Sequence, residues 1–380
     1  MAPEKPVGPL DSAFGGGYIC RPVRLCPQWD RGSRGKGDEY AEYETGRVLE
    51  ILSDSCEPDP NADGAYRGDQ SLLVEVTSGQ YRGQTLLTTN AVGPLYGEPA
   101  ALGDRVTLII STFSDGSHNA TIYEYDRSTA IYLVLAAFLL VTVLVGGKTG
   151  AKSILGLILT VAALLTLLIP LLLKGWPTVL TTFLLCSYVA VVCFVILGGV
   201  NRKILCACLG TVAGMALAML FGLGAQALAH VDGLRISDVE PLLQLRQSGT
   251  PIGLRGLLVA GIIISALGAV MDVAMSISSA LSELKAVNPE LTRRDLWKSG
   301  RNIGRDMVGT MTNTLILAFL GSGFTLIIYL YSLDLPWHEL MSSSYLALEV
   351  VSGVASAIGV ILSVPVTTIF GSVLFSQKTH

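Results

Sequence analysis

The residues of this sequence that could do chemistry are acidic and hydroxyl side chains within long apolar stretches. Asp272 lies in such a stretch, and Ser276 and Ser279 follow it four and seven residues later, which places all three on one face of a helix. A charge near the centre of a bilayer costs about 2.5–3.5 kcal/mol on insertion scales, so membrane helices carry one only where it is sheltered or used. Asp272 is therefore the leading candidate for a functional group.

The next apolar stretch carries a second polar face at helical spacing, made of Asp306, Thr310, Asn313 and Thr314. Because successive spans run antiparallel, Asn313 would lie at a depth comparable with that of Asp272. If the two faces meet, the carboxylate gains amide and hydroxyl partners, and the buried cluster could bind a cation or accept a proton during alternating access. The alternative is structural, since hydroxyls and amides commonly join membrane helices, and Asp272 could be a protonated structural group.

Glu349 lies near the outer end of the last apolar stretch and is the third candidate on a solute or ion pathway. A role in transport and a purely structural role are equally compatible with this position. The sequence contains no phosphate-binding P-loop, no His-Glu-x-x-His and no Gly-x-Ser-x-Gly. These absences exclude an ATP-driven pump within the chain and give little support to a membrane-embedded hydrolase. We expect no enzymatic activity, no catalytic residues, no cofactor and no metal site.

The stretches that carry these residues are predicted to be membrane-spanning helices. Charged residues form only 15% of the 380 residues and hydrophobic residues form 51%, whereas about a quarter of the residues in a soluble protein are charged. This composition excludes a disordered protein, a nucleic-acid-binding protein with a basic field and a purely soluble enzyme. Seven stretches are long enough for a helix to cross a bilayer, and they cover residues 129–147, 153–173, 177–199, 204–229, 256–281, 307–331 and 345–372.

Basic residues between the predicted spans indicate the orientation. Of the 15 Lys and Arg residues after residue 128, eleven lie on the same side as the C-terminus and four on the opposite side. The positive-inside rule therefore places the C-terminus in the cytoplasm and residues 1–128 outside. Six of the eleven fall in the loop over residues 282–305. They could also engage anionic lipid or a soluble partner, although signalling of topology is the simpler interpretation.

Residues 1–128 have a net charge of −8 and a different pattern. Residues 1–40 are rich in Gly, Pro and Arg and predict a flexible segment. Residues 41–127 predict a small OB-like or SH3-like β-barrel, with five short strands over residues 43–51, 71–77, 84–89, 104–112 and 119–125. Stacking aromatics beside a basic groove are missing, so we expect no nucleic-acid partner.

The seven cysteines leave disulfide bonding open. A bridge between Cys20 and Cys26 is compatible with an extracytoplasmic location, but Cys56 makes the count there odd and leaves one thiol over. Cys206 and Cys208 open a predicted helix, where alternate side chains point about 200° apart. Packing therefore explains these two residues better than a metal site does.

The start of the chain raises a question of translocation. The first 17 residues contain no apolar run of the kind that forms a signal peptide. Either the first span translocates the external domain, or a further helix precedes it in the native chain. We favour the second explanation.

Two segments are distinctive enough for comparison with known families. They are Gly268-Ala269-Val270-Met271-Asp272-Val273-Ala274 with the serines after it, and the stretch from Gly304 to Leu315, with Tyr43–Ile51 and Gly93–Tyr96 in the external domain as further points of similarity. The sequence resembles the YibE/F-like family of bacterial multi-pass membrane proteins over residues 40–375. The resemblance implies a bacterial inner-membrane protein with an external β-domain, usually preceded by a membrane helix. It implies no biochemical activity.

The sequence thus predicts an α-helical polytopic membrane domain of about seven spans over residues 128–380, preceded by an extracytoplasmic β-barrel-like domain. The leading hypothesis is a secondary transporter or permease for a small solute or ion in the bacterial plasma membrane, centred on Asp272 and Asn313. The rival hypothesis is a non-transporting anchor or assembly partner whose β domain binds a ligand or protein. The expected partners are the lipid bilayer and that solute or ion, and formation of a homo-oligomer stays open.

Overall fold

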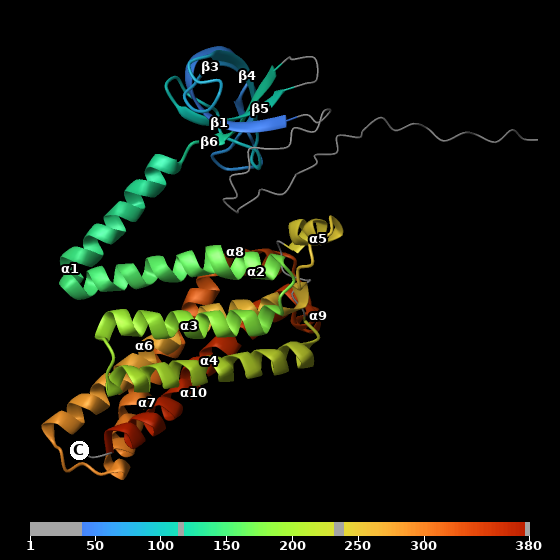
Figure 1. Cartoon of the computed structure of the whole chain (residues 1–380). Coiled ribbons are helices and arrows are strands. Elements are labelled where there is room, and N and C mark those ends of the chain that lie inside the picture. The colour runs from blue at the N-terminus through green and yellow to red at the C-terminus, as the bar shows by residue number, and fades with distance from the viewer. Residues whose placement is uncertain (1–39, 113–117, 232–238, 377–380) are drawn as a thin grey trace, which may run out of the picture. The chain divides into compact units, whose positions relative to one another are not determined.

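The computed structural model describes residues 40–112, 118–231 and 239–376 (Figure 1). Most of the predicted flexible segment, with Cys20 and Cys26, lies outside the described residues. The chain divides into two compact units, one over residues 28–145 and the other beginning at Gly146.

The first unit contains a closed β-barrel. Its strands are β1 (Tyr40–Asp54), β2 (Glu57–Pro58), β3 (Tyr66–Val76), β4 (Thr85–Val92), β5 (Arg105–Thr112) and β6 (His118–Tyr125). They lie in the order β1-β5-β6-β4-β3-β2, and β1 also pairs with β3, which closes the sheet. The long strand β1 can serve both neighbours because its register shifts twice, between Val48 and Glu50 and between Ile51 and Ser53. A closed sheet has no long free edge.

Alternation of apolar and polar residues produces the barrel core. Leu72, Val74 and Val76 on β3 are buried while the residues between them are partly exposed. The same alternation buries three residues of β5, namely Val106, Leu108 and Ile110. Successive residues of a strand point to opposite faces, so this pattern fills one side of the sheet with side chains. The small N-terminal β-barrel expected from the sequence is confirmed, with β2 as a short additional strand.

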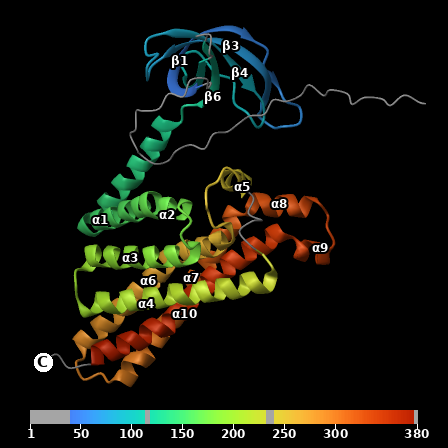
Figure 2. The same ribbon diagram turned by 45° about the vertical axis from the view of Figure 1, so that its right-hand side comes forward.

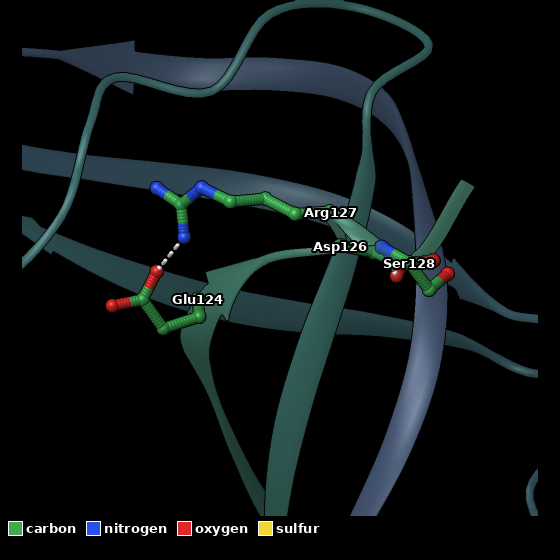
Figure 3. A network of polar contacts seen from close by, with 4 residues as sticks. All are labelled: Glu124, Asp126, Arg127 and Ser128. Carbon is green, nitrogen blue, oxygen red and sulfur yellow. Dashed lines mark hydrogen bonds and ion pairs between the residues drawn. The ribbon is translucent and has the colours of Figure 1, made fainter. Parts of the chain in front are cut away.

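A short polar network marks the point where the barrel chain enters α1 (Ser128–Ala163). Asp126 Oδ1 accepts a hydrogen bond from the backbone N–H of Ser128 at 3.0 Å, and Arg127 donates to Glu124 across 2.5 Å (Figure 3). Hydrogen bonds from the side chain and backbone of Ser128 hold the pKa of Asp126 below its usual value. Asp126 thereby caps the first turn of α1, where backbone N–H groups have no helical partner.

The second unit is a bundle of helices (Figures 1 and 2). Beyond α1 it contains the π-helical turn η1 (Leu164–Leu168), α2 (Ile169–Leu173), α3 (Thr178–Gly198), α4 (Arg202–Ala229), α5 (Val239–Gln247), η3 (Leu254–Gly256), α6 (Leu257–Val287), α7 (Arg293–Ser322), α8 (Phe324–Ser332), α9 (Trp337–Ser342) and α10 (Ser344–Ser376). Helix α10 continues through Pro365.

Five helical segments of the described chain are long and apolar enough to cross a membrane, or six if α7 and α8 form one broken span bent by 61°. The prediction of seven spans is not confirmed. The difference arises because the first two predicted spans fall within one helical segment of 46 residues, Ser128–Leu173. A straight helix of 46 residues would be about 69 Å long, roughly twice the thickness of a hydrocarbon core, but this segment is two helices joined at a kink. Its backbone leaves the helical conformation at Gly147 (φ 53°, ψ −134°).

Helices α4, α6 and α10 form the centre of the bundle, with α7 packed against α6 and α10. Small residues allow α4 and α10 to approach closely. A Cβ atom placed on Gly214 of α4 would lie 2.7 Å from the Cβ atom of Ser363, and one on Gly359 of α10 would lie 2.5 Å from that of Ala218. Small residues four apart are a common basis of helix association in membranes, because they bring the two backbones into contact.

Candidate functional site

The face of α6 that carries Asp272 is not covered by any other described element of the chain. Val270, Val273 and Ile277 are buried against α4 and α10, whereas Asp272 and Ser276 are exposed. The difference follows from helical rotation, since residues two apart lie on nearly opposite sides of a helix. Ser279 lies on the same side as Asp272 and is half-buried.

At Ser265 this face of α6 is covered by α10. Ser265 Oγ lies 2.7 Å from Ser356 Oγ of α10, and both hydroxyls also bond to carbonyl groups of their own helices. One turn further along α6 the face opens, because a Cβ atom placed on Gly268 would meet no neighbouring atom within 4 Å. The open face therefore begins at Gly268 and continues through Asp272, Ser276 and Ser279; these four residues are called the open α6 face below.

Helix α7 presents its own polar residues away from the bundle. Gly300 and Gly304 are buried at its contact with α6 and α10, and a Cβ atom on Gly304 would lie 3.6 Å from Ile277 Cδ1. Asn313 is nine residues after Gly304, which is about 180° around a helix, and it is exposed. Thr310 and Thr314 are also exposed, and their hydroxyls donate to carbonyls within α7.

The expectation of a buried cluster of Asp272 with Asn313 is wrong for the single chain. Both side chains are exposed, and neither forms a hydrogen bond or ion pair with another described residue. The reason is that the glycine side of α7 makes the close contact with its neighbours, so its polar side turns outward. Within the isolated chain the two polar stripes do not form one site.

Glu349 belongs to a different region of the bundle. It lies at the break between α7 and α8, where its Cδ atom is 3.6 Å from the position of a Cβ atom on Gly323. It lines two small cavities of about 160 and 170 Å³, and Leu326 also lines both of them. Glu349 is seven residues before Ser356, and Asp272 is seven residues after Ser265. Because those serines touch and the helices run parallel, the two carboxylates are separated by about 20 Å along the axes.

The barrel contains an open groove of about 860 Å³ that the sequence analysis did not identify. Its lining includes Asp54, Asp63, Glu98 and Glu124, together with the exposed rings of Tyr66 and Tyr96. Hydrogen bonds, first from the backbone of Cys56 and then from Gln70, lower the pKa of Asp54 and keep it ionised. The groove is built from loops that lie far apart in sequence, so no local pattern predicted it.

The described cysteines Cys56, Cys186, Cys193, Cys206 and Cys208 are all free. Cys56 also lines the barrel groove, and burial together with the neighbouring Asp54 carboxylate raises its pKa to about 11. A thiol with so high a pKa is a poor nucleophile at neutral pH. Among the residues that the structure describes, no group of three His, Cys, Asp or Glu side chains is placed to hold a metal ion.

Comparison with known proteins gives one family. Residues 134–377 match the family described as YibE/F-like protein, whereas no curated protein and no solved structure matches the chain. The matched range includes the open α6 face and Glu349 but begins after the barrel, so it is narrower than the resemblance over residues 40–375 noted from the sequence. More than half of the chain lies within the match, and its apolar helices are those of a membrane protein. The chain therefore belongs to the YibE/F-like family.

Proposed function

We propose that this protein is a permease for a small solute or ion in the bacterial plasma membrane, and that the open α6 face lines its pathway. The observation that carries the proposal is the exposure of Asp272 at the centre of that face, within a helix long enough to span the bilayer. The barrel lies outside the cell and the C-terminus inside, as the distribution of basic residues predicts. The chain acts without enzymatic catalysis.

The cost of a charge in hydrocarbon favours this function. Leaving an ionised Asp272 in contact with lipid costs about 2.5–3.5 kcal/mol on insertion scales, so the open α6 face must meet water or protein. Helix α7 also presents polar groups that must meet water or protein, because Asp306, Thr310 and Asn313 are exposed in the single chain. A second copy of the chain that faces α6 and α7 would enclose these groups and leave a polar passage between the protomers. The site is thus incomplete in one protomer.

Substitution of Asp272 tests the proposal. Amino acids, sugars, organic acids and metal cations are first screened for their effect on the thermal unfolding of the full-length chain in detergent. A compound that stabilises the wild type is then used in uptake measurements with proteoliposomes. We expect Asp272→Asn to abolish both the stabilisation and the uptake, because the amide has the same shape but cannot carry the charge.

The matched control is Glu339→Gln, which removes one exposed carboxylate of α9 outside the open α6 face. It should leave uptake unchanged. Uptake by Asp272→Asn at the wild-type rate would remove this carboxylate from the mechanism. Full folding and uptake in Asp272→Leu would show that the site merely tolerates a carboxylate.

The barrel groove supports a second candidate function, a membrane-anchored binding protein. Four carboxylates and two tyrosines line the groove against one cation, Arg127, which pairs with Glu124. The remaining negative charge and the exposed rings favour a cationic ligand, since aromatic faces attract cations. A screen of amines and Lys-rich peptides against the full-length chain would test this function by the change in tyrosine fluorescence. Binding that disappears in Tyr66→Ala/Tyr96→Ala but persists in Asp272→Asn would favour the anchor over the permease.

A further inference from the structure

Four basic residues of α7 form a stripe on one side of the helix. They recur at spacings of four, three and four residues, and all are exposed: Arg294, Lys298, Arg301 and Arg305. With a rotation of about 100° per residue they fall within a sector about 60° wide. Along the axis the stripe is about 17 Å long. These four residues are called the basic stripe below.

The direction of the basic stripe is fixed by the packing of α7. Leu296, Gly300 and Gly304 are buried on another side of the helix, roughly 130° from the stripe. A Cβ atom on Gly300 would meet Thr368 of α10 at 2.7 Å and Leu281 of α6 at 3.3 Å, so α7 cannot roll without losing this contact. The basic stripe therefore points away from the bundle.

The turn before α7 is also held firmly. Lys285 Nζ donates to the carbonyls of Pro289 and Leu291 at 2.7 and 2.9 Å. Thr292 and Asp295 form a reciprocal capping box at the start of the helix. The position of the basic stripe thus depends on a braced hairpin between α6 and α7.

No acidic side chain in the part of the chain that the structure describes forms a direct ion pair with the basic stripe. Among the described residues the ion pairs within 4 Å join Arg67 to Asp59 and Arg127 to Glu124, both in the barrel unit. Two acids are adjacent to the stripe in sequence, Asp295 and Asp306. Asp295 accepts hydrogen bonds from Thr292 and attracts Arg294 and Lys298 at longer range. Trp297 lies beside the stripe with 39% of its surface exposed, and the guanidinium of Arg301 is 5.0 Å from its ring centroid. The stripe is therefore a cationic surface with an aromatic edge, and Asp295 offsets part of its charge only at the end with Arg294 and Lys298.

We propose that the basic stripe binds the anionic headgroups of phospholipids at the membrane surface where α7 enters the bilayer. The charge of the stripe is complementary to phosphate, and α7 continues without interruption from Arg305 to Ser322. Clusters of Lys and Arg directly beside a membrane helix attract anionic lipid, and Trp side chains favour the interface. A topology signal requires only a number of charges in the loop, whereas four charges aligned on one exposed face form a contact surface.

Native mass spectrometry of the full-length chain in detergent tests this inference, with phosphatidylglycerol or phosphatidylcholine as the titrated lipid. We expect the wild type to bind phosphatidylglycerol more tightly than phosphatidylcholine. Arg301→Gln/Arg305→Gln should weaken binding of the anionic lipid by about five-fold for each charge removed, and added salt should weaken it further. Binding of phosphatidylcholine should not change.

Two controls separate a lipid surface from net charge alone. Lys148→Gln/Lys152→Gln removes two exposed basic residues elsewhere and should keep the preference for phosphatidylglycerol. Arg301→Gln/Asn302→Arg keeps the number of charges in the loop, and therefore its topology signal, but moves one charge about 100° around the helix; it should lose about five-fold. Equal affinity of the wild type for the two lipids would overturn the inference. Equal weakening by the Lys148→Gln/Lys152→Gln variant would overturn it as well.

Discussion

Gly214 on α4 and Ser363 on α10 lie so close that a Cβ atom on the glycine would be 2.7 Å from Ser363 Cβ and 2.7 Å from Val270 Cγ1. This three-helix contact of α4, α10 and α6 is the tight centre of the bundle. It fixes the rotation of α6 about its axis, because Val270 must point inward at this level. Asp272, two residues further along, must then point outward.

Substitution of Gly214 should therefore destabilise the bundle. We expect Gly214→Val to reduce the free energy of unfolding by about 1–3 kcal/mol, because the added methyl groups have no space between α4 and α10. Thermal unfolding of the purified chain in detergent measures the effect. The control is Gly224→Ala in the same helix, where an added Cβ meets no neighbouring atom within 4 Å. If the two variants unfolded at the same temperature, the close contact of α4 with α10 would be wrong.

A second copy over the open α6 face should be detectable by cross-linking. In a background without the native cysteines, Gly268→Cys and Ser276→Cys place thiols on that face. Mild oxidation in membranes should produce disulfide-linked dimers, read on non-reducing gels. Ser278→Cys provides the control, since Ser278 is buried and its hydroxyl donates to the carbonyl of Lys203. Monomers from all three variants would argue that lipid or water, rather than a second protomer, covers α6.

Gln70 should be important for stability of the barrel. Its side chain is buried, donates to Asp54 at 2.9 Å, and accepts from Asn90 at 3.0 Å and from the backbone N–H of Ala100 at 2.8 Å. Gln70→Ala leaves the buried N–H of Ala100 without its acceptor and removes one of the two acceptors of the Asn90 amide, and an unsatisfied buried donor costs about 1–3 kcal/mol. Gln84→Ala, at an exposed position of the same unit, should be neutral. Chemical denaturation followed by tyrosine fluorescence compares them, and an unaltered midpoint in Gln70→Ala would contradict the network.

Acid should loosen the junction between the barrel and α1. The pKa of Asp126 is lowered in the folded state by hydrogen bonds from Ser128. A carboxyl group with a depressed pKa stabilises the fold at pH values above its unfolded pKa, and this contribution disappears as pH falls through the folded value. The loss should therefore occur below about pH 4. Hydrogen exchange of the amides in the first turn of α1 would report it.

Asp126→Asn is the control for this pH dependence. The amide keeps an acceptor for the Ser128 N–H but does not titrate, so exchange in the variant should change little with pH over the same range. Exchange that accelerates equally in the variant and the wild type would assign the acid effect to other carboxyl groups.

Local patterns in the sequence were sufficient to predict the membrane region and the strands of the barrel. The length of an apolar run decides whether a helix can cross a bilayer, and alternation along Leu72, Val74 and Val76 decides which side of a strand is buried. The number of spans could not be predicted in this way, because the segment Ser128–Leu173 is interrupted only by a kink at Gly147 and the break between α7 and α8 occurs at one residue. Composition cannot distinguish a continuous helix from two that share an end.

The candidate site, too, could be predicted from the sequence only in part. The spacing of Asp272, Ser276 and Ser279 correctly placed them on one side of α6, because that relationship depends only on helical geometry. Which neighbour this side meets was decided by packing: Gly300 and Gly304 give α7 its closest approach, so Asn313, half a turn away, faces outward. A sequence specifies the angle between two residues of one helix, but only contacts between helices determine which side of the helix faces the core.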